Sequence, residues 1–132
     1  MPSQTVEKLH YISPVHQGNL YIAELLLEAG ANPNLQHTGG ELPLHLAAKT
    51  GNEYIEQALT AHGADINYRN QRGESPLLLA AKNNRNNIVS FLIKKGAFVS
   101  VPDILNHTPL YYASKGGYNE IVELLIMAGA EA

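Results

Sequence analysis

One dipeptide recurs through the chain at a constant interval. Gly-Ala occurs at positions 30–31, 63–64, 96–97 and 129–130, so successive copies are 33 residues apart. The same interval separates isoleucines, leucines and Pro-Leu pairs at Ile22, Ile55, Ile88 and Ile121, at Leu26, Leu59, Leu92 and Leu125, and at Pro43, Pro76 and Pro109. A unit of this length cannot bury its hydrophobic face alone, so such periods are typical of stacked repeats. The 132 residues are four times 33. We therefore expect one repeat domain over residues 1–132, with units at about 1–34, 35–67, 68–100 and 101–132.

The second unit shows most clearly how one repeat is expected to fold. Pro43 suits the first turn of a helix, since its missing N–H would be unpaired there in any case, and Gly51 ends that helix. A second helix is predicted over residues 53–61, where Ile55 and Leu59 lie four residues apart on one face. Each unit is therefore predicted to be a pair of helices that must stack on its neighbours.

The first helix of each unit carries a specific motif. The segment Leu42-Pro43-Leu44-His45-Leu46-Ala47 resembles the T-P-L-H-x-A signature of ankyrin repeats, and residues 75–80 and 108–113 are similar to two further copies. The resemblance implies an all-α ankyrin-repeat solenoid of helix-turn-helix units with short β-hairpin-like fingers. It also implies a protein-protein interaction module that binds a protein or peptide partner, without catalysis or cofactors.

Several positions depart from the family pattern. The family's threonine is replaced by Leu42 and Ser75, which predicts weaker capping hydrogen bonds in two units. Asn84 occupies the inter-helix position that is glycine at Gly51 and Gly117, and asparagine is the residue that best tolerates a left-handed backbone there. Residues 1–34 keep only the outer helix clearly, as expected of an atypical terminal repeat.

Composition argues against several functional classes. A net charge of -3 offers no general attraction to nucleic acid, and the absence of cysteine excludes disulfides and thiolate metal sites. The six histidines share no ligand spacing, and no catalytic motif is present, so we predict neither a metal site nor an enzyme. Without a signal peptide or a membrane-length apolar run, we expect an intracellular, cytoplasmic protein that does not enter the membrane.

A row of lysines is the first candidate binding feature. Lys49, Lys82 and Lys115 occupy equivalent positions near the ends of the first helices, and His16 matches them in the first unit. By resemblance to the family, these positions line a concave groove, where a lysine row would suit an acidic partner. The alternative is that these cations merely favour helix C-termini and are neutralised by Glu41 and Glu74.

The turn tips form a second candidate surface, because they vary between units while the scaffold repeats. Ile104 and Leu105 are apolar where the other tips are polar. They are predicted either to anchor a partner or to pack onto the neighbouring finger. The predicted partner-binding residues outside the lysine row are His37, Glu41, Arg72, Glu74, Ile104, Leu105, His107 and Tyr112.

Two asparagines close the extended segments that follow the Gly-Ala pairs. Asn34 and Asn67 each have a leucine eight residues earlier. In the ankyrin family, asparagine at this position can be hydroxylated by an asparaginyl hydroxylase. The alternative is an asparagine that simply bonds the backbone of its turn.

The last two expectations concern the second helices of the repeats. The fourth carries more apolar residues than one buried stripe needs, over residues 121–127. Two interpretations follow for this apolar face. The chain is a monomer that belongs to a longer protein, as a targeting or regulatory domain of an enzyme or effector, or the face self-associates. In the second unit, Glu56 and Thr60 stand where the fourth has Val122 and Ile126, so this unit is predicted to fray first.

Overall fold

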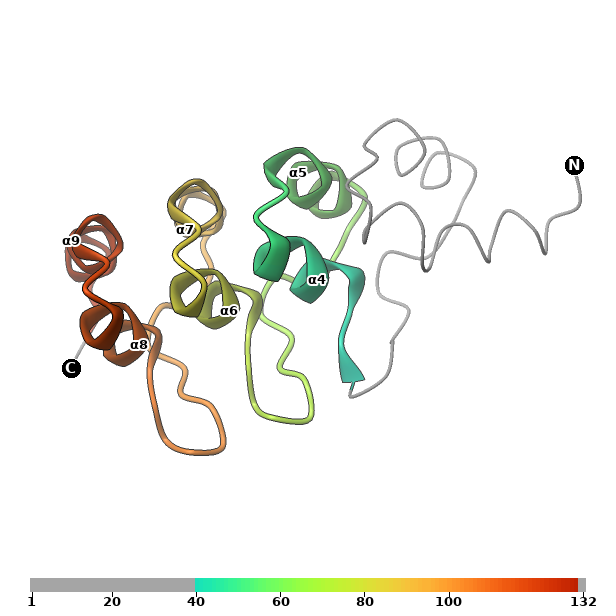
Figure 1. The fold of residues 1–132 in the computed structure, drawn as a ribbon. Helices are drawn as coiled ribbons and strands as arrows, with labels where there is room; N and C mark the ends of the chain where they lie inside the picture. The colour runs from blue at the N-terminus through green and yellow to red at the C-terminus, as the bar shows by residue number, and fades with distance from the viewer. Residues whose placement is uncertain (1–39, 131–132) are drawn as a thin grey trace, which may run out of the picture.

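Helices account for most of the ordered secondary structure. The computed structural model describes residues 40–130, and within them the chain forms three successive pairs of helices (Figure 1). The pairs are α4 (Pro43–Thr50) with α5 (Glu53–Ala61), α6 (Pro76–Lys82) with α7 (Asn86–Lys94), and α8 (Pro109–Gly116) with α9 (Asn119–Met127). No helix among these residues is long and apolar enough to span a membrane.

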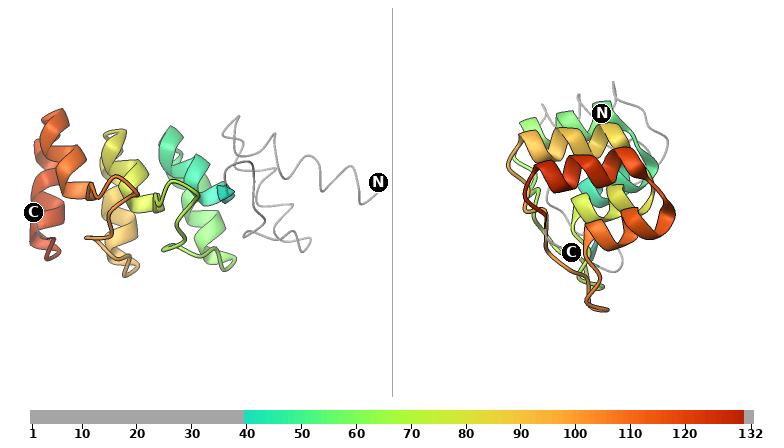
Figure 2. Two further views of the ribbon diagram at one scale, coloured as in Figure 1. Left: turned by 90° about the horizontal axis from the view of Figure 1, so that it is seen from below. Right: turned by 90° about the vertical axis from the view of Figure 1, so that its left-hand side faces the viewer.

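The helix pairs stack one behind the next along a single axis. The inner helices α4, α6 and α8 form one row and the outer helices α5, α7 and α9 form a second row above it (Figures 1 and 2). The loops that join one pair to the next extend away from the outer row as fingers, which we define as residues 68–75 and 101–108. The described part of the chain is therefore an all-α solenoid.

The core lies between the two rows, at the positions that repeat in the sequence. The isoleucine and leucine of each outer helix, spaced four residues apart, are completely buried or nearly so, as are the small residues of the inner helices. Burying one such aliphatic side chain stabilises the fold by about 1.5–3 kcal/mol. These buried residues are Ile55, Leu59, Ile88, Leu92, Ile121 and Leu125, with Ala47, Ala80 and Ala113 opposite them.

The capping expectation was wrong for one of the two substituted positions. Ser75 Oγ accepts a hydrogen bond from the Leu78 N–H at 3.1 Å, the same distance at which Thr108 Oγ1 accepts from the Tyr111 N–H. A serine hydroxyl therefore caps this helix as well as the threonine does. Leu42 provides no such acceptor, as predicted, and its own N–H donates to Nδ1 of His45 at 3.0 Å instead.

The corners between inner and outer helices require a left-handed backbone, as predicted for all three described repeats. The φ angle is 80° at Gly51, 59° at Asn84 and 73° at Gly117. Gly51 also lies against the next repeat, because a Cβ built there would be 2.8 Å from Cδ of Arg85. Glycine is favoured at this corner by its backbone angle, and any added Cβ would also force the Arg85 side chain to move.

Gly51→Ala should lower the free energy of unfolding by about 1–2 kcal/mol, the cost of placing a Cβ in the left-handed region. The contact with Arg85 adds to that cost. Urea unfolding monitored by circular dichroism measures the change. Asn84→Gly is the matched variant, because it places glycine at the equivalent corner, and it should leave stability unchanged or slightly raised. Equal losses in both variants would contradict the backbone explanation.

Candidate binding surface

Two of the three lysines of the row are paired with a carboxylate of their own repeat. Lys49 Nζ lies 3.1 Å from a carboxylate oxygen of Glu41, and Lys82 Nζ lies 3.4 Å from one of Glu74. Each pair joins the end of an inner helix to the turn that precedes it. Ion pairs this exposed on the lysine side contribute only about 0–1 kcal/mol. Their main effect is to neutralise the positive charge of these two positions.

Lys115 differs from the other two lysines. The position equivalent to Glu41 and Glu74 is His107 in its repeat, so the carboxylate is missing. Among residues 40–130, no acidic side chain pairs with Lys115, and its Nζ lies 5.7 Å from the ring centre of Tyr111. The positive charge of the three lysines is therefore concentrated in the last described repeat.

The fingers are held by a side-chain acceptor that the sequence reading missed. Asn70 Oδ1 accepts hydrogen bonds from the N–H groups of Arg72 and Glu74, at 2.9 and 3.0 Å. One period later, Asp103 Oδ1 accepts from the N–H groups of Leu105 and His107, both at 3.0 Å. The sequence did contain a signal for this arrangement. An Asn or Asp stands at the start of both turns, one repeat period apart, and both residue types readily make such bonds.

Adjacent fingers are also bonded to each other. The Ile104 N–H donates to the Arg72 carbonyl at 3.0 Å. The guanidinium of Arg69 bridges the two fingers, because it donates to the Gly73 carbonyl at 3.1 Å and to the Pro102 carbonyl at 2.7 Å. The tips are thus fixed relative to one another, which reduces the ordering cost of binding at their surface.

The apolar side chains of the second finger point outward. Ile104 is 68% exposed and Leu105 is 65% exposed, so neither packs onto the neighbouring finger. Arg72 is exposed on the first finger, whereas Glu74 is almost fully buried. Of the predicted tip residues, Glu74 therefore acts within the scaffold.

A cluster of aromatic rings lies at the base of the second finger. The Tyr112 hydroxyl donates to the Asp103 carboxylate, and the His107 ring stacks on Tyr111 with centroids 4.0 Å apart. Burial and the bond to Asp103 raise the pKa of Tyr112 to about 12. Burial would raise the pKa of Asp103, but the hydrogen bonds from Tyr112 and from the backbone outweigh it and hold that pKa below its usual value. Tyr112 therefore stays protonated and Asp103 stays ionised throughout the neutral range.

His45 lies inside the scaffold and is not accessible to a partner. Its Nε2 lies 2.9 Å from the Tyr68 carbonyl and 3.0 Å from the Glu74 carbonyl, while Nδ1 accepts from Leu42. Burial lowers the pKa of His45, and the two carbonyl contacts oppose that shift only in part. A neutral ring that donates from Nε2 satisfies all these contacts, so His45 joins the second repeat to the third.

Asn67 bonds the backbone of the following repeat. Its Oδ1 accepts from the Phe98 N–H at 2.9 Å, and its own N–H donates to the Asp65 carboxylate at 3.1 Å. The side-chain amide is thus part of the connection between neighbouring repeats. Hydroxylation of Asn67 stays a prediction.

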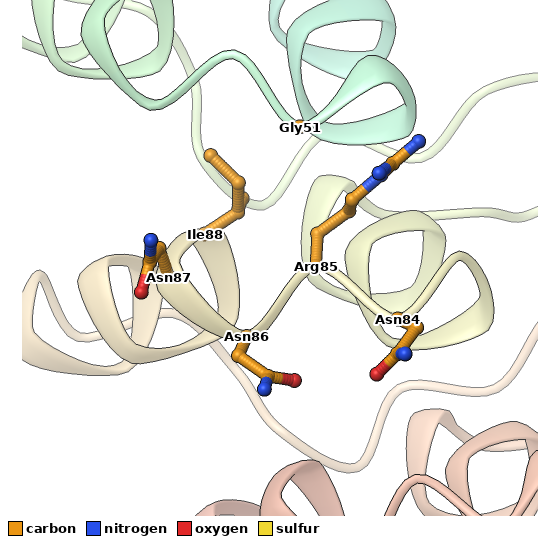
Figure 3. Close-up of a pocket in the computed structure, with 6 residues that line it drawn as sticks. All are labelled: Gly51, Asn84, Arg85, Asn86, Asn87 and Ile88. Atoms are coloured by element: carbon orange, nitrogen blue, oxygen red, sulfur yellow. The ribbon is translucent and has the colours of Figure 1, made fainter.

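The polar corner of the third repeat surrounds a hollow of about 320 Å³ (Figure 3). Arg85 crosses from this corner toward the second repeat, where its Nε donates to the Lys49 carbonyl at 3.2 Å. The Asn86 amide donates to the Glu120 carboxylate. The Arg85 guanidinium is the most strongly charged group beside the hollow, and it is engaged with the backbone of the second repeat. This corner therefore connects the two repeats. The residues that line it are Gly51, Asn84, Arg85, Asn86, Asn87 and Ile88.

Three predicted site residues, His16, Asn34 and His37, lie outside the described residues. Within residues 40–130, no three His, Asp or Glu side chains gather closely enough to hold a metal ion.

Comparison with known families gives one result. A family model described as ankyrin repeats (3 copies) matches residues 9–103 and again residues 55–132. None of the curated proteins compared matches the chain significantly.

Proposed function

This chain belongs to the ankyrin repeat family, and on that basis we propose that it binds a protein or peptide through its inner helices and fingers. Ankyrin repeats are generally protein-interaction modules, and domains of this kind are typically non-catalytic. Stacking places equivalent positions of successive repeats side by side, which creates one extended surface for a partner.

The observation that carries this proposal is the rigid finger with exposed apolar side chains. The Asx turns and the inter-finger bonds fix the backbone on both sides of Ile104 and Leu105. Large apolar side chains on a rigidly held backbone at an exposed tip make favourable anchors, because little loop freedom is lost on binding. Lys115 on the neighbouring inner helix α8 supplies positive charge, which favours a partner of acidic character.

Panning a phage library of random linear peptides against the chain, followed by amide hydrogen exchange of the complex, tests the proposal. Protection is expected in both fingers and in α6 and α8. Leu105→Ser should lower the affinity for the selected peptides about fivefold to tenfold, since loss of an anchor costs more than about 1 kcal/mol of binding free energy. Tyr54→Ser is the matched control, because Tyr54 is equally exposed, at 65%, on an outer helix.

Two results would contradict the proposal that the inner helices and fingers form the binding surface. The first is protection confined to the outer helices α7 and α9. The second is a loss of affinity in Tyr54→Ser that equals the loss in Leu105→Ser, because Tyr54 lies on the outer row. Failure to recover any peptide would count against a peptide-binding function altogether.

A second candidate function is self-assembly through the last outer helix. Ile126 is 56% exposed and Met127 is 85% exposed, both near the end of α9. Such apolar exposure is typical of contact surfaces when it is contiguous. A molecular mass that rises with protein concentration, and falls back in Met127→Ser, would support it.

A further inference from the structure

The third repeat gathers aromatic and basic side chains at the end of its outer helix. Both phenylalanines of the chain and its only pair of adjacent lysines fall within residues 91–98. This stretch covers the end of α7 and the segment that leads from it into the second finger (Figure 1). No other repeat has this combination at the equivalent positions. We define the α7 patch as Phe91, Lys94, Lys95 and Phe98.

The exposed positions of the α7 patch face solvent in a complete stack of repeats as well. Phe98 is 63% exposed, and both lysines are exposed. In the second repeat the same three positions are Ala61, His62 and Asp65, and they remain exposed although the third repeat is stacked beside them. A neighbouring repeat therefore does not cover these positions.

The scaffold itself gives no reason for a phenylalanine at position 98. Asp65, at the equivalent position, accepts a hydrogen bond from the Asn67 N–H at 3.1 Å and so stabilises its turn. A phenylalanine side chain cannot accept such a bond, and most of its surface stays in water. Single exposed apolar residues are common, but Phe98 follows two adjacent cations by only three residues. An aromatic ring in this setting has the character of a binding anchor.

The backbone that carries Phe98 is fixed in the free chain. The Phe98 N–H donates to Oδ1 of Asn67 at 2.9 Å, and the Ala97 N–H donates to the Leu92 carbonyl at 3.0 Å. The segment is thus bonded both to the preceding repeat and to its own outer helix. Because little backbone freedom remains to be lost, binding at Phe98 carries a small ordering cost.

The two lysines determine the chemistry of the partner. Among residues 40–130, neither Lys94 nor Lys95 forms an ion pair, whereas Lys49 and Lys82 each do. Lys95 Nζ lies 5.7 Å from the ring centre of Phe91, which leaves its charge without a counter-ion. Carboxylates of a partner can approach both ammonium groups without breaking an internal ion pair. The net charge of -3 opposes attraction of the whole chain to an anionic membrane, so local acidic groups of a protein fit better.

We propose that the α7 patch binds an acidic segment of a partner protein. An apolar side chain of that segment packs against Phe98, and adjacent carboxylates pair with Lys94 and Lys95. This surface lies at the end of an outer helix, whereas the proposed function uses the inner helices and the finger tips. The chain would then hold two partners at once, one on each surface.

Panning the random peptide library against Leu105→Ser tests this second surface, because that variant lacks the finger anchor. Fluorescence anisotropy measures the affinities, and peptides that combine Asp or Glu with an apolar residue are expected. Phe98→Asp should lower their affinity at least about tenfold, since it removes the anchor and adds a like charge. Lys94→Ala together with Lys95→Ala should lower it about fivefold and reduce its dependence on salt. Aspartate or alanine occupies an equivalent position in another repeat, at Asp65, Ala61 and Ala128, so these variants should fold.

Tyr54→Ser is the matched control, since Tyr54 is 65% exposed at the start of another outer helix, and it should change affinity less than about twofold. Selected peptides that all keep their affinity in Phe98→Asp would overturn the inference, whether or not the fingers bind a partner. Recovery of peptides from the parent but none from Leu105→Ser would overturn it and leave the proposed function intact. Recovery from neither would overturn both. Sedimentation with phosphatidylserine vesicles that Phe98→Asp abolishes would assign the patch to a lipid surface and overturn the protein partner.

Discussion

Glu56→Val should raise the free energy of unfolding at pH 8 by about 1–3 kcal/mol, the usual penalty of a buried polar group without a partner. Glu56 is completely buried in α5, and neither carboxylate oxygen has a hydrogen-bond partner among the described residues. Valine is the residue at the equivalent position of the third repeat, where Val89 is also completely buried. Urea unfolding of the two proteins measures the difference.

The pH dependence of this gain identifies its cause. Burial raises the pKa of Glu56 well above its ordinary value, so the folded state binds a proton that the unfolded state releases. Stability from this group is complete below the unfolded pKa and is lost as the pH rises through the folded pKa. The advantage of Glu56→Val should therefore be smaller at pH 4 than at pH 8. A gain that is the same at both pH values would contradict the buried-charge explanation.

Two further variants separate the contributions. Glu56→Gln removes the charge but keeps an unpaired polar group, so it should recover part of the gain. Glu123→Gln, on the exposed surface of α9, is the matched control and should change stability by less than about 0.5 kcal/mol.

In the parent, amide hydrogens of α5 should exchange faster than those of α7, because the second repeat is predicted to fray first.

His45→Leu should lower the free energy of unfolding at pH 8 by about 2–4 kcal/mol. Leucine fits the scaffold, since Leu78 occupies the equivalent position, but it leaves the buried Leu42 N–H without the acceptor that His45 provides and removes the contacts of Nε2 with the carbonyls of Tyr68 and Glu74. Each buried group that loses its partner costs about 1–3 kcal/mol. Urea unfolding measures the loss, and His62→Leu, at an exposed histidine, is the control with little expected effect.

The loss in His45→Leu should shrink in acid. Burial lowers the pKa of His45, so its stabilising contribution is present above the unfolded value of 6.5 and is lost as the pH falls through the folded pKa. The two unfolding curves should therefore lie closer together at pH 5 than at pH 8. A difference that widens in acid would show that the ring is bound as the charged form and would contradict the hydrogen-bond assignment.

The repeat period, together with the proline and glycine positions and the resemblance to the ankyrin signature, was enough to predict the helices of the second repeat. The predicted second helix of the second unit coincides with α5, and the left-handed corner at Asn84 follows from its place in the repeat. The helix and the corner both depend on positions within one repeat, and these positions can be identified from the sequence alone. Capping at Ser75 was misjudged because a change of residue type was equated with loss of a bond, although the serine hydroxyl reaches the same N–H group.

Contacts across space were much less predictable. The sequence offered as one alternative that Glu41 and Glu74 would neutralise lysines, since both stand at equivalent places in the turns before the inner helices, and both ion pairs form. It did not indicate that Tyr112 would bond Asp103, which requires knowing how the finger folds back on α8. It also could not show that the carboxylate of Glu56 is enclosed, because a long side chain at a helix surface can otherwise reach water.

Stacking along one axis has a mechanical consequence. Each helix contacts the other helix of its own repeat and the equivalent helices of the repeats beside it, so the described repeats form a series of interfaces. A force applied along that axis would load every interface equally, and the weakest would open first while the others held. Under tension the array would lengthen in steps of one repeat, acting as a spring that yields gradually instead of a globule that ruptures at once.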